Sequence, residues 1–117
     1  MTNDEMIARL SGWGCNMEAA LTRTAGDKDF YTTLLTTYKD TLPLAELRSQ
    51  VADGKVKEAF ETAHMLKGVL GNLGLDPMYR QIVLIVEPLR AGSAEGLLPL
   101  VDTLIGQKAE LDALLKD

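Results

Sequence analysis

The sequence has few of the residues that cross-link small proteins or hold metals. Among its 117 residues there is one cysteine, Cys15, and one histidine, His64. A single cysteine forms no intramolecular disulfide, which is typical of proteins in a reducing compartment. One cysteine and one histidine supply none of the usual zinc ligand sets, so no metal site is expected. Aromatic residues make up only 5% of the chain, and the core is therefore predicted to be aliphatic.

Long apolar runs and excess positive charge are also missing. The longest apolar run, from Ile82 to Val86, is far below the roughly 18 residues that a membrane-spanning helix needs. Asp and Glu number 17 against 12 Lys and Arg, a net charge of −5, which argues against binding to nucleic acid or anionic membranes. The acidic N-terminus lacks the cationic start of a signal peptide. We therefore expect a cytoplasmic protein that binds neither nucleic acid nor membrane.

What remains is a helix-forming composition. Leu, Ala, Glu, Lys and Met are plentiful, and no segment alternates as a strand. The length fits one domain over residues 1–117 with a core of its own. Apolar residues recur with helical spacing over about 27–41, 43–53, 55–73, 76–88 and 94–115. We predict an all-α fold, an antiparallel four-helix bundle over about 27–115, with short N-terminal helices over about 4–24 capping one end.

Capping residues and glycines set the expected helix ends. The first helix is expected to run from Asp4 to Leu10, where glycines follow. Gly74 is expected to end the helix that contains His64, in a left-handed conformation. Pro88 is expected to kink or end the next helix. The predicted N-terminal caps are Thr2, Asn16, Asp27, Asp76 followed by Pro77, and Ser93.

His64 falls on the polar side of its predicted helix. At about 100° per residue, Lys67, Gly68 and Gly71 lie on the same face at i+3, i+4 and i+7. Lys57, seven residues earlier, shares that face. His64 is therefore predicted to be exposed in locally positive surroundings. The opposite face carries the apolar residues Ala59, Ala63, Leu66, Leu70 and Leu73.

The spacing alone leaves the purpose of this face open. A glycine inside a helix costs about 1 kcal/mol relative to alanine. Gly68 and Gly71 either let another helix pack closely or clear space for a large partner that approaches the imidazole. Lys57 and Lys67 are either ordinary solvated residues or a landing site for a phosphoryl group or an acidic partner.

Two stretches together resemble a known family. The first reads Ala20-Leu21-x-Arg23-x-x-Gly26-Asp27-x-x-Phe30-Tyr31, and the second reads His64-x-x-Lys67-Gly68-x-x-Gly71-Asn72-x-Gly74. Both resemble the histidine-containing phosphotransfer (HPt) domain, a module of multistep two-component phosphorelays. The resemblance covers about residues 12–91, and it implies the same four-helix bundle.

The resemblance implies a role for each residue of the histidine face. His64 would accept a phosphoryl group from an aspartyl phosphate on one receiver domain and pass it to an aspartate on another, in a hybrid sensor kinase or a response regulator. Lys67 would offset the charge of the transferred group. Gly68 and Gly71 would let the receiver close over the ring. Lys57 and Asn72 complete the expected binding set.

The resemblance also implies a phosphocarrier rather than an enzyme. The Mg²⁺ of this chemistry belongs to the receiver domain, so no cofactor or metal is expected on this chain. A free imidazole is largely neutral at pH 7 and needs no general base. No strand followed by a glycine-rich nucleotide loop is present, so ATP binding is not expected. We expect a monomer, and the initiating methionine favours a free-standing protein.

Two alternative functions use the same residues differently. A helical adaptor could bind a receiver domain without being phosphorylated, but it would not need both His64 and Lys67. A hydrolytic or acid–base enzyme would need a carboxylate to orient the imidazole. Glu61 lies close enough in sequence for that, although an ion pair with Lys57 is the simpler expectation.

Overall fold

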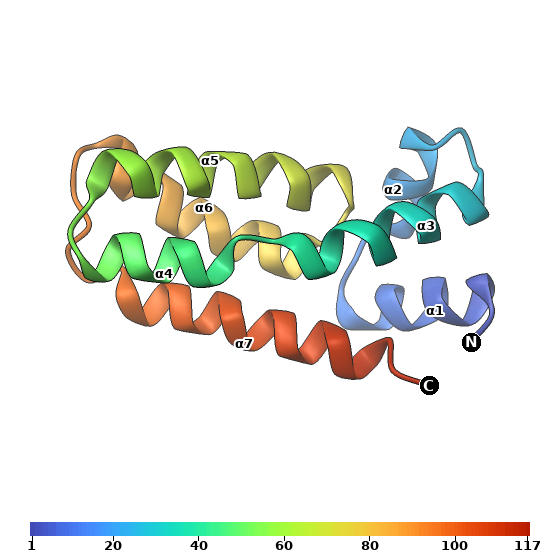
Figure 1. Ribbon diagram of the computed structural model, residues 1–117. Helices are drawn as coiled ribbons and strands as arrows, with labels where there is room; N and C mark the ends of the chain where they lie inside the picture. The colour runs from blue at the N-terminus through green and yellow to red at the C-terminus, as the bar shows by residue number, and fades with distance from the viewer.

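The computed structural model covers residues 1–117 and contains α-helices joined by turns, with no strand (Figure 1). The all-α prediction is confirmed. No helix has the length and apolar character needed to cross a membrane. The elements in chain order are α1 (Asn3–Trp13), α2 (Met17–Arg23), α3 (Lys28–Tyr38), the 3₁₀ turn η1 (Lys39–Thr41), α4 (Leu44–Ala52), α5 (Val56–Asn72), α6 (Asp76–Arg90) and α7 (Leu98–Leu114).

The last four helices enclose the main core. Each of α4, α5, α6 and α7 packs against the next, and α7 closes the ring against α4. Consecutive helices among these four run antiparallel (Figure 1). α3 lies in line with α4 and extends to the other end of the molecule, where it packs with α1 and α2. The predicted four-helix bundle with short N-terminal helices at one end is confirmed.

The interior is one aliphatic cluster. It contains 24 buried apolar side chains, among which Tyr31 is the only aromatic. The Tyr31 hydroxyl donates a 2.6 Å hydrogen bond to the Leu73 carbonyl, where α5 ends. Burial raises the pKa of Tyr31, so the hydroxyl keeps the proton that this bond needs. Burial also raises the pKa of the Cys15 thiol to about 11, so this cysteine is inert.

Three helix ends differ from the sequence expectation. α1 continues through Gly12 to Trp13 and ends at Gly14, which has φ +115°. α6 continues past Pro88 to Arg90. The last helix begins at Leu98, four residues later than expected, because Gly96 has φ +73°, a conformation that a helix does not accommodate.

Three of the five predicted caps are confirmed, and Asp76 and Ser93 have other roles. Thr2, Asn16 and Asp27 each accept a hydrogen bond from a backbone N–H of the first helical turn. Asp76 does not cap α6. Its carboxylate instead accepts a 2.6 Å hydrogen bond from the Asn16 backbone N–H, in the turn between α1 and α2. Asp76 therefore ties the N-terminal helices to the start of α6.

Candidate functional site

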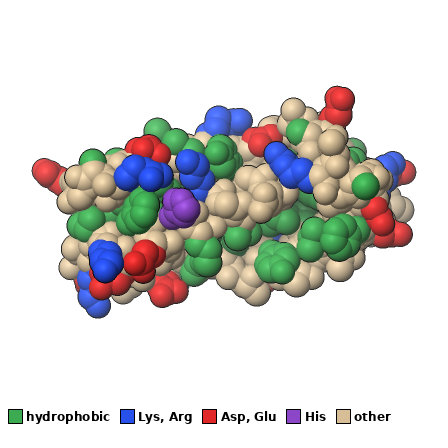
Figure 2. Space-filling model, turned by 90° about the horizontal axis from the view of Figure 1, so that it is seen from above, with side chains coloured by type: hydrophobic (Ala, Val, Ile, Leu, Met, Phe, Trp, Pro, Cys, Tyr) green, Lys and Arg blue, Asp and Glu red, His purple; other side chains and the backbone are tan.

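α5 presents His64 away from the core. The side of α5 that faces the other helices is buried, and His64 lies on the exposed side, as predicted. The space-filling view shows the imidazole at the surface, beside basic and apolar side chains (Figure 2). α5 ends at Asn72, and Gly74 follows in the predicted left-handed conformation, with φ +71°. The Leu75 N–H bonds back to the Leu70 carbonyl, the pattern of a glycine-terminated helix.

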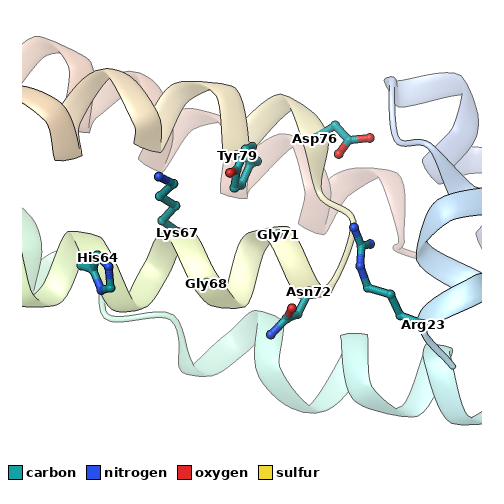
Figure 3. Close-up of a pocket in the computed structure, with 8 residues that line it drawn as sticks. All are labelled: Arg23, His64, Lys67, Gly68, Gly71, Asn72, Asp76 and Tyr79. Carbon is teal, nitrogen blue, oxygen red and sulfur yellow. The ribbon is translucent and has the colours of Figure 1, made fainter.

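A polar pocket of about 500 Å³ opens along this face of α5. The pocket brings together five of the six residues that the sequence singled out for the site, and Lys57 is the one that does not line it. Lys67 extends toward α6, while Arg23 reaches in from α2 (Figure 3). The lining residues are Arg23, His64, Lys67, Gly68, Gly71, Asn72, Asp76 and Tyr79.

Three lining residues were not predicted as site residues. Arg23 comes from α2, and Asp76 and Tyr79 come from the first turns of α6. Arg23 belongs to the N-terminal stretch that resembles the family, and this resemblance was the one indication in the sequence that Arg23 could be a site residue. Tyr79 lies within the segment of about residues 76–88 in which apolar residues recur with helical spacing, and Asp76 was expected to cap that helix. The position of all three depends on packing between helices that the sequence pattern does not specify.

The imidazole rests on an aromatic neighbour one helical turn earlier. The Phe60 ring lies 5.6 Å from the His64 ring, with the two planes tilted by 35°. The Arg90 guanidinium lies 5.2 Å from the centre of the Phe60 ring and pairs with Glu87 at 3.4 Å. No hydrogen bond within the chain engages either nitrogen of His64. The imidazole is therefore supported by packing while both nitrogens remain available to a partner.

The two glycines beside His64 have different surroundings. A Cβ atom at Gly68 would meet no other atom within 4 Å. A Cβ at Gly71 would lie 3.2 Å from Cε2 of Tyr79, tighter than ordinary contact. Close packing of another helix, one of the two explanations that the sequence left open, therefore applies to Gly71, whereas the space beside Gly68 is empty. Gly68 has no side chain to project beside the imidazole, and Gly71 lets α6 approach α5 closely.

An apolar surface adjoins the same stretch of α5. Met65, next to His64, is 51% exposed, and Tyr38 is 47% exposed. Tyr38 also lines a groove together with Leu34, Val69, Asn72 and Leu73. Large side chains exposed together are typical of a surface that another protein covers.

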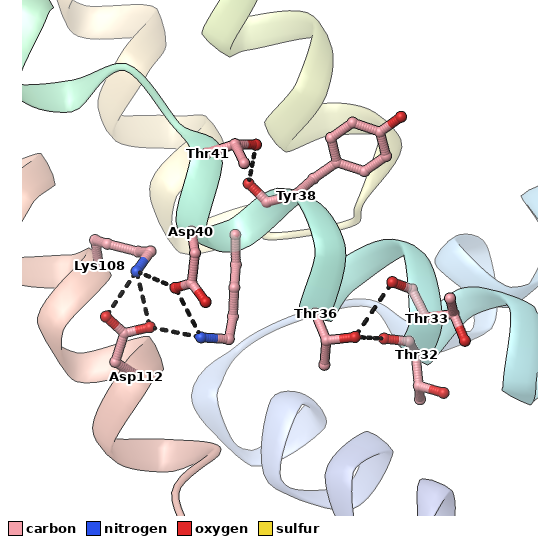
Figure 4. Close-up of polar contacts among 9 residues, drawn as sticks. Thr32, Thr33, Thr36, Tyr38, Asp40, Thr41, Lys108 and Asp112 are labelled. Carbon is pink, nitrogen blue, oxygen red and sulfur yellow. Dashed lines mark hydrogen bonds and ion pairs between the residues drawn. The ribbon is translucent and has the colours of Figure 1, made fainter.

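A second cluster of charged side chains lies away from the pocket, between η1 and α7 (Figure 4). Lys39 contacts Asp40 at 3.0 Å and Asp112 at 3.1 Å. Lys108 contacts Asp112 at 2.6 Å and Asp40 at 3.3 Å. Hydrogen bonds from the two lysines lower the pKa of Asp40. Burial opposes ionisation of Asp112, but the same lysines outweigh it and lower its pKa as well. The cluster fastens η1 to α7.

Asp112→Asn is expected to weaken the acid dependence of stability. A carboxyl with a lowered pKa in the fold stabilises it above the unfolded pKa of about 3.9, and this contribution is lost as pH falls through the folded value. Because Asp112 is 44% exposed, the loss at pH 7 should stay below about 1 kcal/mol. Urea unfolding between pH 7 and pH 2.5 measures it. Asp53→Asn removes an exposed carboxylate that forms no ion pair. The free energy of unfolding of this control should depend on pH as it does in the wild type. Equal slopes for all three proteins would contradict the prediction.

Comparison with known proteins identifies the family. The model of the family described as Hpt domain matches residues 30–117, which include most of α3, all of α4 to α7 and every pocket residue except Arg23. Searches of curated proteins and of solved structures gave no match. No group of three or more His, Cys, Asp or Glu side chains is placed to hold a metal ion.

Proposed function

The chain belongs to the Hpt domain family, whose members carry phosphoryl groups between receiver domains in two-component signalling, and from this premise we propose that His64 is the phosphoacceptor. The observation that carries the proposal is the exposure of the only histidine of the chain on a face with a cation and an open glycine beside it. We further propose that Lys67, Gly68, Gly71 and Asn72 form the site around it, and that the phosphoryl group passes from one receiver domain through His64 to another.

The reaction needs little from the chain beyond a positioned nucleophile. A lone pair on an imidazole nitrogen of His64 attacks the phosphorus of an aspartyl phosphate on the receiver. The bond from phosphorus to the aspartate oxygen breaks, the carboxylate leaves with its electron pair, and a nitrogen–phosphorus bond forms. The proton on the other ring nitrogen stays in place. Reversal of these bond changes on a second receiver passes the group on. Packing against Phe60 supports the ring during this exchange.

The surface around the imidazole suits a docked receiver domain. The exposed Met65 and Tyr38 side chains and the groove that Tyr38 lines supply apolar area on one side of His64. Gly68 leaves room for the receiver to approach the ring. We propose that the partners are the receiver of a hybrid sensor kinase and that of a response regulator, with the Mg²⁺ held by the receiver. The buried lone cysteine suits a cytoplasmic setting for this exchange.

Lys67→Ala is expected to slow transfer by about tenfold or more. The ammonium of Lys67 lines the same pocket as His64, and a cation near the transferred group stabilises its charge as the bonds exchange. The rate of label uptake from a phosphorylated receiver, measured in single turnover, tests this. Lys57→Ala is the matched control because it removes the same charge from the same helix outside the pocket. Equal slowing by both substitutions would contradict a special role for the pocket cation and would support the sequence prediction that Lys57 also belongs to the binding face.

One experiment separates the proposal from the adaptor alternative. A receiver domain carrying radiolabelled phosphate is mixed with the full chain, and label and binding are both followed. Acid-labile label on the chain supports a phosphocarrier. A receiver that binds the chain without transferring label would favour the adaptor and overturn the proposal.

A further inference from the structure

Arg23 is a charged residue in the pocket with no partner in the chain. It ends α2, is exposed, and forms no ion pair with any carboxylate. Its side chain reaches toward the C-terminal end of α5, at the opposite end of the pocket from His64 (Figure 3). His64 and Asn72 are eight residues apart on α5, which corresponds to about 12 Å of helix rise. Arg23 therefore lines the end of the pocket that is remote from the imidazole.

The position of Arg23 is fixed by contacts between the N-terminal helices and the turn after α5. Gly74 lies so close to α2 that a Cβ there would come within 2.6 Å of Ala20 Cβ and 4.0 Å of an Arg23 Nη1 atom. The Tyr31 hydroxyl bonds to the Leu73 carbonyl. The Asp76 carboxylate accepts from the Asn16 N–H. The contacts of Gly74 and Asp76 hold α2 directly, and the Tyr31 bond holds α3, against which α2 packs, so that the last residue of α2 lines the pocket.

The charges of the pocket favour the binding of an acidic group. Arg23 and Lys67 bring two positive charges to its lining, against the single carboxylate of Asp76. One Asp76 oxygen is already occupied by the Asn16 N–H. The chain as a whole has a net charge of −5, so this local excess of positive charge is unlike the average surface. Complementary charge at an interface steers association and selects partners.

We propose that Arg23 is a docking residue that pairs with a carboxylate on the surface of the receiver domain bound over His64. The inference rests on the proposed function and extends it. Arg23 lies outside the stretch that the family model matches, residues 30–117. The N-terminal helices thereby add a contact that the matched bundle alone does not supply. Arg23 acts on the affinity and choice of partner and takes no part in the bond exchange at His64.

The test compares a protein donor with a small donor. The full chain and its Arg23→Gln variant are phosphorylated either by a labelled receiver domain or by phosphoramidate, from which the imidazole nitrogen displaces ammonia. Receiver domains are taken from hybrid kinases and response regulators, and one that binds the wild type is used throughout. The dissociation constant for that receiver is measured at several salt concentrations. Arg80→Gln is the matched control, an exposed arginine with no ion pair that does not line the pocket.

Arg23→Gln should weaken receiver binding about three- to tenfold at low salt, with a smaller salt dependence than the wild type. Its labelling by phosphoramidate should match the wild type, and Arg23→Lys should recover part of the affinity. Unchanged receiver binding would overturn the inference and leave the phosphoacceptor proposal standing. Equal slowing with both donors would also overturn it, because Arg23 would then act through His64 or the fold. A wild type that binds no receiver and takes no label from either donor would overturn the proposed function, and this inference with it.

Discussion

A His64→Gln variant is expected to take up no phosphoryl group from a receiver domain that phosphorylates the wild type. His64 is the only histidine in the chain, so no second imidazole can replace it. A glutamine amide has a similar reach but no nitrogen lone pair free to attack phosphorus. Labelled receiver, mixed with the variant and quenched over a time course, measures the loss. The expected result is complete absence of acid-labile label on the chain.

The same substitution should leave the fold and the docking surface intact. His64 is exposed and makes no hydrogen bond that glutamine would lose, and exposed substitutions of this kind usually change stability by less than about 0.5 kcal/mol. Some loss of packing on Phe60 falls within that range. Receiver binding by His64→Gln near the wild-type dissociation constant would separate lost chemistry from lost docking. Full labelling of this variant would place the phosphoryl group on another residue and contradict the proposal.

The helix that carries His64 could be predicted closely because its signals are local. The alternation of Ala63, Leu66 and Leu70 with polar residues fixed which side of α5 is buried. Gly74 marked its end. These features depend on neighbours within four residues along the chain, which is the range that helical periodicity describes.

The composition of the pocket could not be predicted in the same way. Arg23, Tyr79 and the carboxylate of Asp76 reach it only because α2 and α6 meet α5 at particular points. Asp76 had the sequence signature of a helix cap, but its carboxylate bonds to the Asn16 N–H, a partner 60 residues away. A local preference was replaced by a tertiary contact that no spacing along the chain reveals.

Two of the three helix ends that were mispredicted, those of α1 and α7, have a common cause. Gly12 and Gly14 were both expected to end the helix. Only Gly14 does so, because one glycine inside a helix costs only about 1 kcal/mol of stability. Before α7, Ser93 read as a cap, yet its hydroxyl bonds to the Glu95 N–H within a turn. Where several signals of similar strength are adjacent, small energies decide among them, and the sequence alone does not rank them.

Gly74→Ala is expected to destabilise the fold by about 3 kcal/mol, through two effects that can be separated. At φ +71°, a residue with a Cβ costs about 1–2 kcal/mol. The new Cβ would also lie 2.6 Å from Ala20 Cβ, so α2 must move away, and such overpacking costs a further 1–3 kcal/mol or so. Gly54→Ala is the control, since Gly54 has φ +68° but no atom within 4 Å of its Cβ position. Urea unfolding followed by circular dichroism measures both variants.

Gly54→Ala should therefore show only the backbone cost, and the difference between the two variants reports the contact with α2. Adding Ala20→Gly to Gly74→Ala should recover part of that difference, although a glycine inside α2 has a cost of its own. Equal losses in the two single variants would show that α2 does not press on Gly74. If α2 does move, Arg23 moves with it, and Gly74→Ala should also weaken receiver binding while phosphoramidate still labels His64. The close approach at Gly74 then couples the stability of the N-terminal helices to partner recognition.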